Sequence, residues 1–243
     1  MTKIALVLAA GKGTRMRSVL PKPLVLFAER PLVSHIIEAF RKAGVSDVNL
    51  VIGYEGEKVK RTIGNQVGYV YQEVQLGTAH AVMQAKYMLD WKGKDIFVFV
   101  GDAPLISPDT IQRLALHHQQ TNAACTFLTA DFEIDLPYAR VLKDENGKLL
   151  SCIEEQDATE EEKKIKELLS SHFIFKADIL FQFLEFILPH PKSGEYYLTE
   201  IIPLLLKEKY KVETLKINDY RQLVGLNTPE EVAWAEQIYC KQL

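Results

Sequence analysis

An apolar run near the start of the chain ends abruptly at two glycines, and this pattern constrains the fold more than any other. Residues 4–10 have the character of a buried parallel strand, and Gly11 and Gly13 follow directly. Glycines after a strand let the backbone turn tightly and direct several N–H groups at one point, which suits phosphate oxygens. The pattern therefore predicts a parallel sheet with a phosphate-binding loop after its first strand.

Two basic residues follow the glycines and strengthen this prediction. Arg15 supplies a planar guanidinium group, and Lys22 supplies a compact positive charge between two prolines that confine its backbone to extended geometry. The spacing is not that of a P-loop, and a dinucleotide fingerprint would need glycine in place of Met16. For a bare Gly-x-Gly a simple turn is the better interpretation, but Arg15 and the Pro-Lys-Pro element favour a triphosphate site.

The remaining strand and helix patterns alternate, which predicts a doubly wound α/β fold with a mostly parallel sheet flanked by helices. After residue 130 the pattern changes to two short strands, then to helices, and a charged run at residues 160–166 predicts an exposed helix. The predicted strands span residues 4–10, 48–52, 67–71, 96–100, 124–129, 139–143 and 149–153, and the predicted helices span residues 32–43, 56–63, 78–89 and 108–120.

The composition favours a globular enzyme. A chain of 243 residues that is 47% hydrophobic can bury a sizeable core, and a formal net charge of −3 argues against a nucleic-acid partner. No stretch reaches the apolar length of a membrane span, and a strand near the N-terminus leaves no room for a signal peptide, so we expect a cytoplasmic protein. The three cysteines are widely spaced, so the sequence suggests neither a disulfide framework nor a zinc site.

Asp102 follows the predicted strand at residues 96–100 and is a candidate metal ligand. Ligands of open α/β sheets gather at the carboxyl ends of the strands, so Gly11, Gly13 and Asp102 should converge. A single carboxylate suits Mg²⁺, which completes its coordination with phosphates and water. From the residues alone, a role for Asp102 as a turn cap is about equally well supported.

A polar segment at residues 72–80 is a candidate base-binding loop. The amide of Gln72 offers a donor and an acceptor, which matches one edge of uracil. Gly77 would let the backbone approach the base, and Thr78 would begin a helix. An ordinary polar loop that caps a helix explains the same residues.

Several motifs together resemble the sugar-nucleotidyltransferase family, and within it the uridylyltransferase half of bacterial bifunctional N-acetylglucosamine-1-phosphate uridyltransferase/glucosamine-1-phosphate acetyltransferases. The resemblance extends over nearly the whole chain. It is carried by LAAGKGTRM at residues 8–16, QEVQLGTAHA at 72–81, GDAPLIS at 101–107, IEEQDAT at 153–159, GEYYLTE at 194–200 and GLNTPEE at 225–231.

The resemblance implies a single nucleotidyltransferase domain over residues 1–243, without the acetyltransferase β-helix. Residues 1–130 would bind the nucleotide, residues 131–227 would form a small β-containing sugar-binding lobe, and residues 228–243 would form a C-terminal helix. The implied residues are Arg15 and Lys22 for catalysis; Leu8, Ala10, Gly11, Gly13, Gln72, Gly77 and Thr78 for the nucleotide; Ala139, Glu154, Tyr197 and Thr199 for the sugar; and Asp102 and Asn227 for Mg²⁺.

The sugar-binding lobe departs from the family pattern. Ala139 stands where the family usually has a glycine that contacts the sugar, and Leu169 stands where it has an asparagine that does so. A leucine cannot make that hydrogen bond, whose loss typically costs about 1–3 kcal/mol.

The implied reaction joins UTP and N-acetylglucosamine 1-phosphate, with Mg²⁺, into UDP-N-acetylglucosamine and pyrophosphate. The partners would be these small molecules, with no nucleic acid and no membrane, and the sequence leaves the oligomeric state open. Another sugar or alditol phosphate, a cytosine nucleotide, or a non-catalytic UDP-sugar-binding role are the alternatives.

Overall fold

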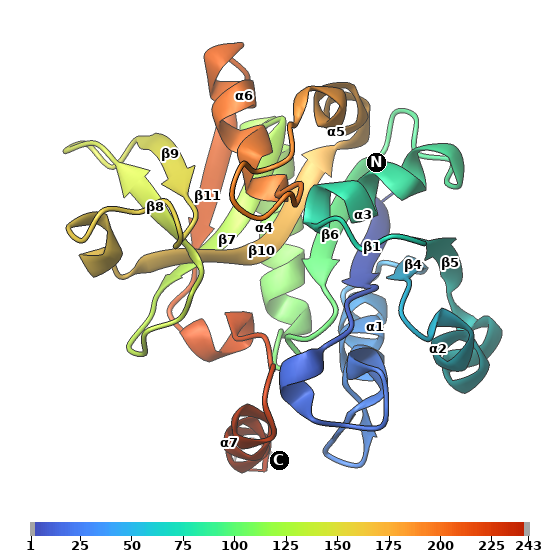
Figure 1. The fold of residues 1–243 in the computed structure, drawn as a ribbon. Helices are drawn as coiled ribbons and strands as arrows, with labels where there is room; N and C mark the ends of the chain where they lie inside the picture. The colour runs from blue at the N-terminus through green and yellow to red at the C-terminus, as the bar shows by residue number, and fades with distance from the viewer. Residues whose placement is uncertain (1–2, 241–243) are drawn as a thin grey trace.

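A mixed β-sheet forms the centre of the computed structural model, which describes residues 3–240 (Figure 1). Along the sheet the strands follow the order β11-β7-β10-β6-β1-β4-β5. In this order the two pairings of β10 are antiparallel and the other neighbouring pairs are parallel. The strands are β1 (Lys3–Ala9), β4 (Asp47–Ile52), β5 (Gly68–Tyr71), β6 (Asp95–Val100), β7 (Cys125–Asp131), β10 (Glu167–Lys176) and β11 (Val212–Lys216).

Helices cover both faces of the sheet, as Figure 1 shows, so the predicted α/β class is confirmed. One core cluster joins the sheet to α1 (Leu32–Lys42), α2 (Gly56–Ile63), α4 (Pro108–Thr121) and α7 (Pro229–Tyr239). The other cluster joins it to α3 (Thr78–Gln84), α5 (Ala177–Phe183) and α6 (Ile201–Lys207).

The first strand shows why residues 4–10 are apolar without alternation. Val7 belongs to the core cluster on one face, and Leu6 belongs to the cluster on the other. Because neighbouring side chains of a strand point to opposite faces, a strand covered on both faces is apolar at every position. The predicted strands and helices of the first 130 residues are confirmed within a few residues, except that α3 ends at Gln84 and continues as a 3₁₀ turn, Ala85–Tyr87.

The two helix starts that carry a proline have the side-chain caps that their sequences suggest. The Ser107 hydroxyl accepts a hydrogen bond from the Thr110 N–H, 3.1 Å away, at the start of α4. Thr228 and Glu231 form a reciprocal capping box at the start of α7.

Residues after 130 form a hairpin beside the sheet and two strands within it. The predicted hairpin is confirmed as β8 (Ala139–Lys143) and β9 (Leu149–Ile153), and β8 also pairs with β10. The strands β10 and β11 were not predicted, and they place part of residues 131–227 in the central sheet. The charged run at residues 160–166 is exposed, as predicted, with Glu160 87% and Glu161 83% exposed, but it forms a 3₁₀ turn, Glu162–Lys164, in place of the expected α-helix.

Short elements complete the described chain. A separate two-stranded sheet pairs β2 (Leu26–Phe27) with β3 (Arg30–Pro31). Within residues 3–240, no helix combines the length and the apolar character needed to cross a bilayer. The remaining 3₁₀ turns are Thr14–Met16, Lys22–Leu24, Gly64–Gln66, Leu184–Phe186, Leu198–Glu200 and Tyr220–Leu223.

Candidate active site

The loop after β1 brings Lys22 to the carboxyl end of the sheet. Gly13 has a φ of +61°, and a Cβ built on it would lie 2.5 Å from the Cβ of Lys22. Glycine at this position therefore leaves room for the Lys22 side chain to cross the loop. Lys22 is largely buried, with a side-chain exposure of 14%, and its ammonium group forms an ion pair with Asp102.

Lys22, Arg15, Asp102 and Asn227, from three distant segments, form a cluster around this ammonium group. The Lys22 ammonium donates to Oδ1 of Asn227 at 2.7 Å, in addition to its contact with Oδ2 of Asp102. Arg15 donates to the same Asn227 oxygen at 2.9 Å. The side chains predicted to hold phosphates and the side chains predicted to hold a metal therefore form one cluster.

The segment before α7 is fitted closely around Asp102. The Leu226 N–H donates to the Asp102 carbonyl at 2.8 Å. A Cβ on Gly225 would lie 2.8 Å from Oδ1 of Asp102, so glycine is needed for this approach. The Gly225 N–H donates to the hydroxyl of Tyr138 at 2.8 Å, and burial is the main cause of that phenol's raised pKa.

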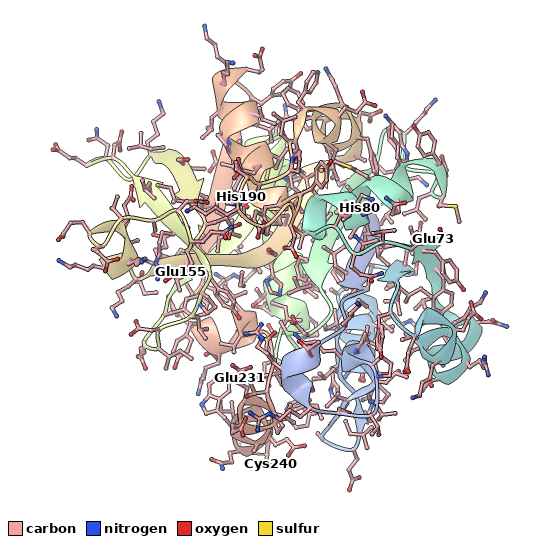
Figure 2. All side chains as sticks on the ribbon, viewed as in Figure 1. Glu73, His80, Glu155, His190, Glu231 and Cys240 are labelled. Carbon is pink, nitrogen blue, oxygen red and sulfur yellow. The ribbon has the colours of Figure 1, made fainter. Side chains whose placement is uncertain are left out.

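Asn227 is held in place by its own backbone neighbours. Its side-chain amide donates to the Gly225 carbonyl at 2.8 Å, which turns Oδ1 toward the basic side chains. Its backbone N–H donates to Glu231 at 2.5 Å, at the start of α7 (Figure 2). Glu231 thus holds Asn227 within the cluster in addition to its part in the capping box of α7.

A cavity of about 260 Å³ lies beside the cluster, and the residues predicted to bind the nucleotide line much of it. Gln72 lies beside it, almost fully buried, and its amide nitrogen donates to the Gly77 carbonyl at 3.1 Å and lies 3.0 Å from Nδ1 of His80. The amide nitrogen thus has partners within the protein, and the amide oxygen is left for other contacts. The lining includes Leu8, Ala10, Gly11, Lys22, Gln72, Gly77, Thr78, Asp102 and Glu195.

Gly77 and Thr78 join this cavity to the segment that follows α5. Gly77 has a φ of +101°, and a Cβ there would lie 2.6 Å from the carbonyl oxygen of Tyr196. The hydroxyl of Thr78 accepts a hydrogen bond from the Leu198 N–H at 2.9 Å. Glycine at residue 77 therefore serves a close backbone approach within the protein, in addition to any role toward a base.

A second cavity, of about 250 Å³, adjoins the first, and Thr78, Val100 and Asp102 line both. Glu154 accepts a hydrogen bond from Thr199 on its wall, and burial raises the pKa of Glu154. Ala139 and Leu169, whose side chains are buried, also line this cavity. The predicted residues on this cavity are Arg15, Thr78, Asp102, Ala139, Glu154, Tyr197, Thr199 and Asn227.

The predicted residues therefore gather in two adjoining cavities, although their roles stay predictions. Gly13 is the exception, because it lines neither cavity and instead makes room for Lys22. Sequence reasoning missed Tyr138, Glu195 and Gly225, whose contacts depend on the folded path of distant segments. Glu195 and Gly225 both lie within motifs that carry the family resemblance, and this was the available signal for them.

Comparison with known proteins identifies the family. Residues 5–176 match the family described as the MobA-like NTP transferase domain. The chain belongs to this family. The match covers the strands and loops that carry Arg15, Lys22 and Asp102, so the chain contains a nucleotidyltransferase domain.

Curated relatives align with this chain over nearly its full length. It is 38% identical to "Bifunctional protein GlmU" of Staphylococcus carnosus over 237 residues, which cover 98% of this chain and 52% of that protein. It is 36% identical to the protein of the same name from Staphylococcus saprophyticus over 243 residues, or 54% of that protein. The chain thus spans about half the length of these relatives.

Solved structures share the fold of this NTP transferase domain. A UDP-glucose pyrophosphorylase complexed with UDP-glucose superposes with a TM-score of 0.77 at 19% identity and covers 100% of both chains. A structure described as a glucose-1-phosphate thymidylyltransferase from Bacillus anthracis gives a TM-score of 0.78 at 16% identity, over 97% of this chain and 94% of that one.

The buried His172 makes the stability of this NTP transferase domain dependent on pH. Burial lowers the pKa of His172 from 6.5 to about 4, so the folded protein keeps this imidazole neutral. The unfolded chain takes up a proton below pH 6.5, which stabilises the unfolded state. We expect the free energy of unfolding to fall from pH 6.5 downward by a total of about 3 kcal/mol, with the loss complete below pH 4.

Urea denaturation at a series of pH values measures this effect. The variant His172→Leu lacks the titrating group, so the difference between its curve and that of the wild-type protein isolates the histidine. Parallel stability curves for the two proteins between pH 4 and 6.5 would contradict the assignment.

Proposed function

We propose that this domain is a Mg²⁺-dependent uridylyltransferase that forms UDP-N-acetylglucosamine and pyrophosphate from UTP and N-acetylglucosamine 1-phosphate. The observation that carries the proposal is the pair of adjoining cavities that share Asp102. One cavity has the glycine loop and Gln72, the other has Glu154 and Thr199, and the cationic groups of Lys22 and Arg15 lie where the two meet. This arrangement suits a reaction that joins two phosphate-bearing substrates.

The comparisons support the proposal at a coarser level. The chain belongs to a family of NTP transferases, and its relatives from Staphylococcus carry the name GlmU. The motifs that resemble the uridylyltransferases contribute residues to both cavities. The substrates, the metal and a cytoplasmic location are our inference from these residues.

In the proposed reaction, a phosphate oxygen of the sugar 1-phosphate attacks the α-phosphorus of UTP. The new P–O bond forms as the bond to the β-phosphate oxygen breaks, and pyrophosphate leaves. Such transfers depend on positioning and charge neutralisation more than on covalent catalysis. We assign Lys22 to the charge on the reacting phosphate and Arg15 to the departing pyrophosphate, and the backbone N–H groups of the glycine loop bind phosphate oxygens.

The side chains of Asp102 and Asn227 fit a magnesium ion. Oxygen atoms of both contact the Lys22 ammonium, so the two atoms already converge on one cationic position. Carboxylate and amide oxygens are ligands that Mg²⁺ accepts, and it needs few of them when phosphates and water supply the rest. A bound Mg²⁺ would neutralise phosphate charge during the transfer. Residues 3–240 contain no cluster of three or more histidine, cysteine, aspartate or glutamate side chains suited to a metal ion, so the proposed site depends on substrate phosphates and water for its other ligands.

A pyrophosphate-release assay with UTP, Mg²⁺ and N-acetylglucosamine 1-phosphate tests the proposal. We expect turnover with this pair, and loss of turnover when EDTA removes the metal. CTP in place of UTP tests the base. Binding of UDP-N-acetylglucosamine without any turnover would instead support the non-catalytic alternative.

A second candidate function differs only in the acceptor, which is the phosphate-bearing substrate that attacks UTP. Leu169 and Ala139 give one wall of the acceptor cavity an apolar surface at positions where the resembling enzymes contact the sugar through polar or backbone groups. Glucose 1-phosphate and an alditol phosphate in the same assay distinguish this candidate, because turnover with one of them and not with the N-acetylated sugar would favour it.

A further inference from the structure

A β-bulge in β10 turns two serines toward the acceptor cavity. The pairing of β10 with β7 shifts register between Leu169 and Phe173, and Ser171 within this interval has a φ of +60°. From Leu169 to Phe173 the strand β10 advances four residues while β7 advances two, from Thr129 to Phe127, so β10 carries two extra residues. Extra residues at a bulge redirect the side chains beside them, and such bulges are common next to active sites. Ser170 and Ser171 both line the acceptor cavity, although they belong to a strand of the central sheet.

Ser170 has a fixed partner on the protein side. Its hydroxyl oxygen lies 3.0 Å from Nδ1 of His172, and both residues are buried, with exposures of 6% and 0%. The imidazole packs edge-on against Phe99, with 4.7 Å between ring centroids. The His172 ring is therefore held rigidly behind the wall of the cavity.

The surroundings of the imidazole determine which nitrogen carries its proton. Nε2 of His172 is buried and has no hydrogen-bond partner among residues 3–240. Nδ1 faces the hydroxyl of Ser170, and the Ser170 carbonyl also stabilises a protonated ring. Because a buried N–H without an acceptor is costlier than a bare acceptor, the neutral ring carries its proton on Nδ1 and donates it to Ser170. The Ser170 hydroxyl proton is then free to point into the cavity.

We propose that Ser170 donates a hydrogen bond to an oxygen atom of the acceptor sugar 1-phosphate and that His172 is the positioning residue that orients this hydroxyl. The proposal rests on the proposed function, since it assigns the second cavity to the acceptor. It supplies a polar contact on the wall where Leu169 supplies none. Ser170 and His172 thus form a specificity element that lies outside the residues expected from the motifs.

Steady-state kinetics of four variants test the pair. We expect Ser170→Ala to raise the KM for N-acetylglucosamine 1-phosphate about tenfold and to leave the KM for UTP within about twofold. His172→Leu should give the same result, and the double variant should be no worse than either single variant, because both remove one interaction. His172→Asn keeps a polar group near the position of Nδ1 and should stay within about twofold of the wild-type protein.

Several kinetic results would overturn the proposal. An unchanged acceptor KM in Ser170→Ala would exclude the contact, and additive effects in the double variant would separate the two residues. An equal rise in both KM values for His172→Leu would indicate a merely structural role. If that variant does not fold, Ser170→Ala and the rescue by His172→Asn still decide the matter.

An NMR titration separates this inference from the proposed function. In protein labelled with ¹⁵N-histidine, N-acetylglucosamine 1-phosphate should shift the Nδ1 resonance of His172, and the shift should be absent in Ser170→Ala. A shift without any turnover would overturn the proposed reaction and retain Ser170 as a sugar-phosphate contact. Turnover without a shift would overturn the role of Ser170 and His172 and retain the reaction.

Discussion

Replacement of Asp102 by alanine is expected to lower kcat at least about 1,000-fold while the protein stays folded. Asp102 lies at the junction of the two cavities, and its carboxylate faces the cationic position that it shares with Asn227. Its removal takes away the charged ligand of the proposed Mg²⁺ and the ion-pair partner of Lys22. Pyrophosphate release at saturating UTP and sugar 1-phosphate measures the effect, and circular dichroism checks the fold.

Asp90, in the loop that precedes β6, offers a matched control. Its side chain is 87% exposed, and it forms an ion pair with Lys94 at 2.9 Å. We expect Asp90→Ala to keep kcat within about twofold, since exposed ion pairs contribute little. If Asp102→Ala retained a tenth of the wild-type rate at ordinary Mg²⁺ concentrations, the metal assignment would be wrong.

Replacement of Lys22 by methionine is expected to lower kcat about 100- to 1,000-fold. Methionine keeps an unbranched apolar side chain that can cross Gly13, but it lacks the ammonium group that contacts Asp102 and Asn227. The reacting phosphate would then lose the cationic group that we assign to its charge. Arginine should not restore the rate, because its planar group does not fit a site formed around a compact ammonium.

The Lys22 prediction has its own control and counter-result. Lys92→Met changes an exposed lysine in the loop before β6 and should leave kcat unchanged. A Lys22→Met variant with normal kcat but a raised KM for UTP would contradict the prediction. It would show that Lys22 contributes to the binding of UTP and gives the transition state no additional stabilisation.

The first half of the fold could be predicted because each local signal agrees with the final structure. Apolar runs in β1, β4 and β6 end at glycines or polar residues, and Ser107 and Thr228 mark the helix starts. The second half could not be predicted as well. The residues of β10 begin Glu-Leu-Leu-Ser-Ser-His, which has no period of two, and its bulge explains the irregularity.

The candidate site was predictable to the extent that it depends on strand ends. Because the carboxyl ends of parallel strands meet at one edge, Gly11 and Asp102 had to lie near each other. The internal hydrogen bonds of Gln72 were not predictable, since the positions of Gly77 and His80 relative to its amide depend on how the loop folds back. The contact of His172 with Ser170 was not predictable either, since it depends on the irregular path of β10.

The insertion of β10 between β6 and β7 has a consequence for biosynthesis. These two strands emerge from the ribosome well before residues 167–176, yet neither can complete its pairing until that later strand arrives. The nascent chain must therefore hold two unsatisfied sheet edges, one of them rich in phenylalanine, during the synthesis of more than thirty intervening residues. Such non-local pairing slows folding and exposes edges to association with other chains. The strand that supplies Leu169, Ser170 and Ser171 to the second cavity therefore also determines how long these edges stay unpaired during synthesis.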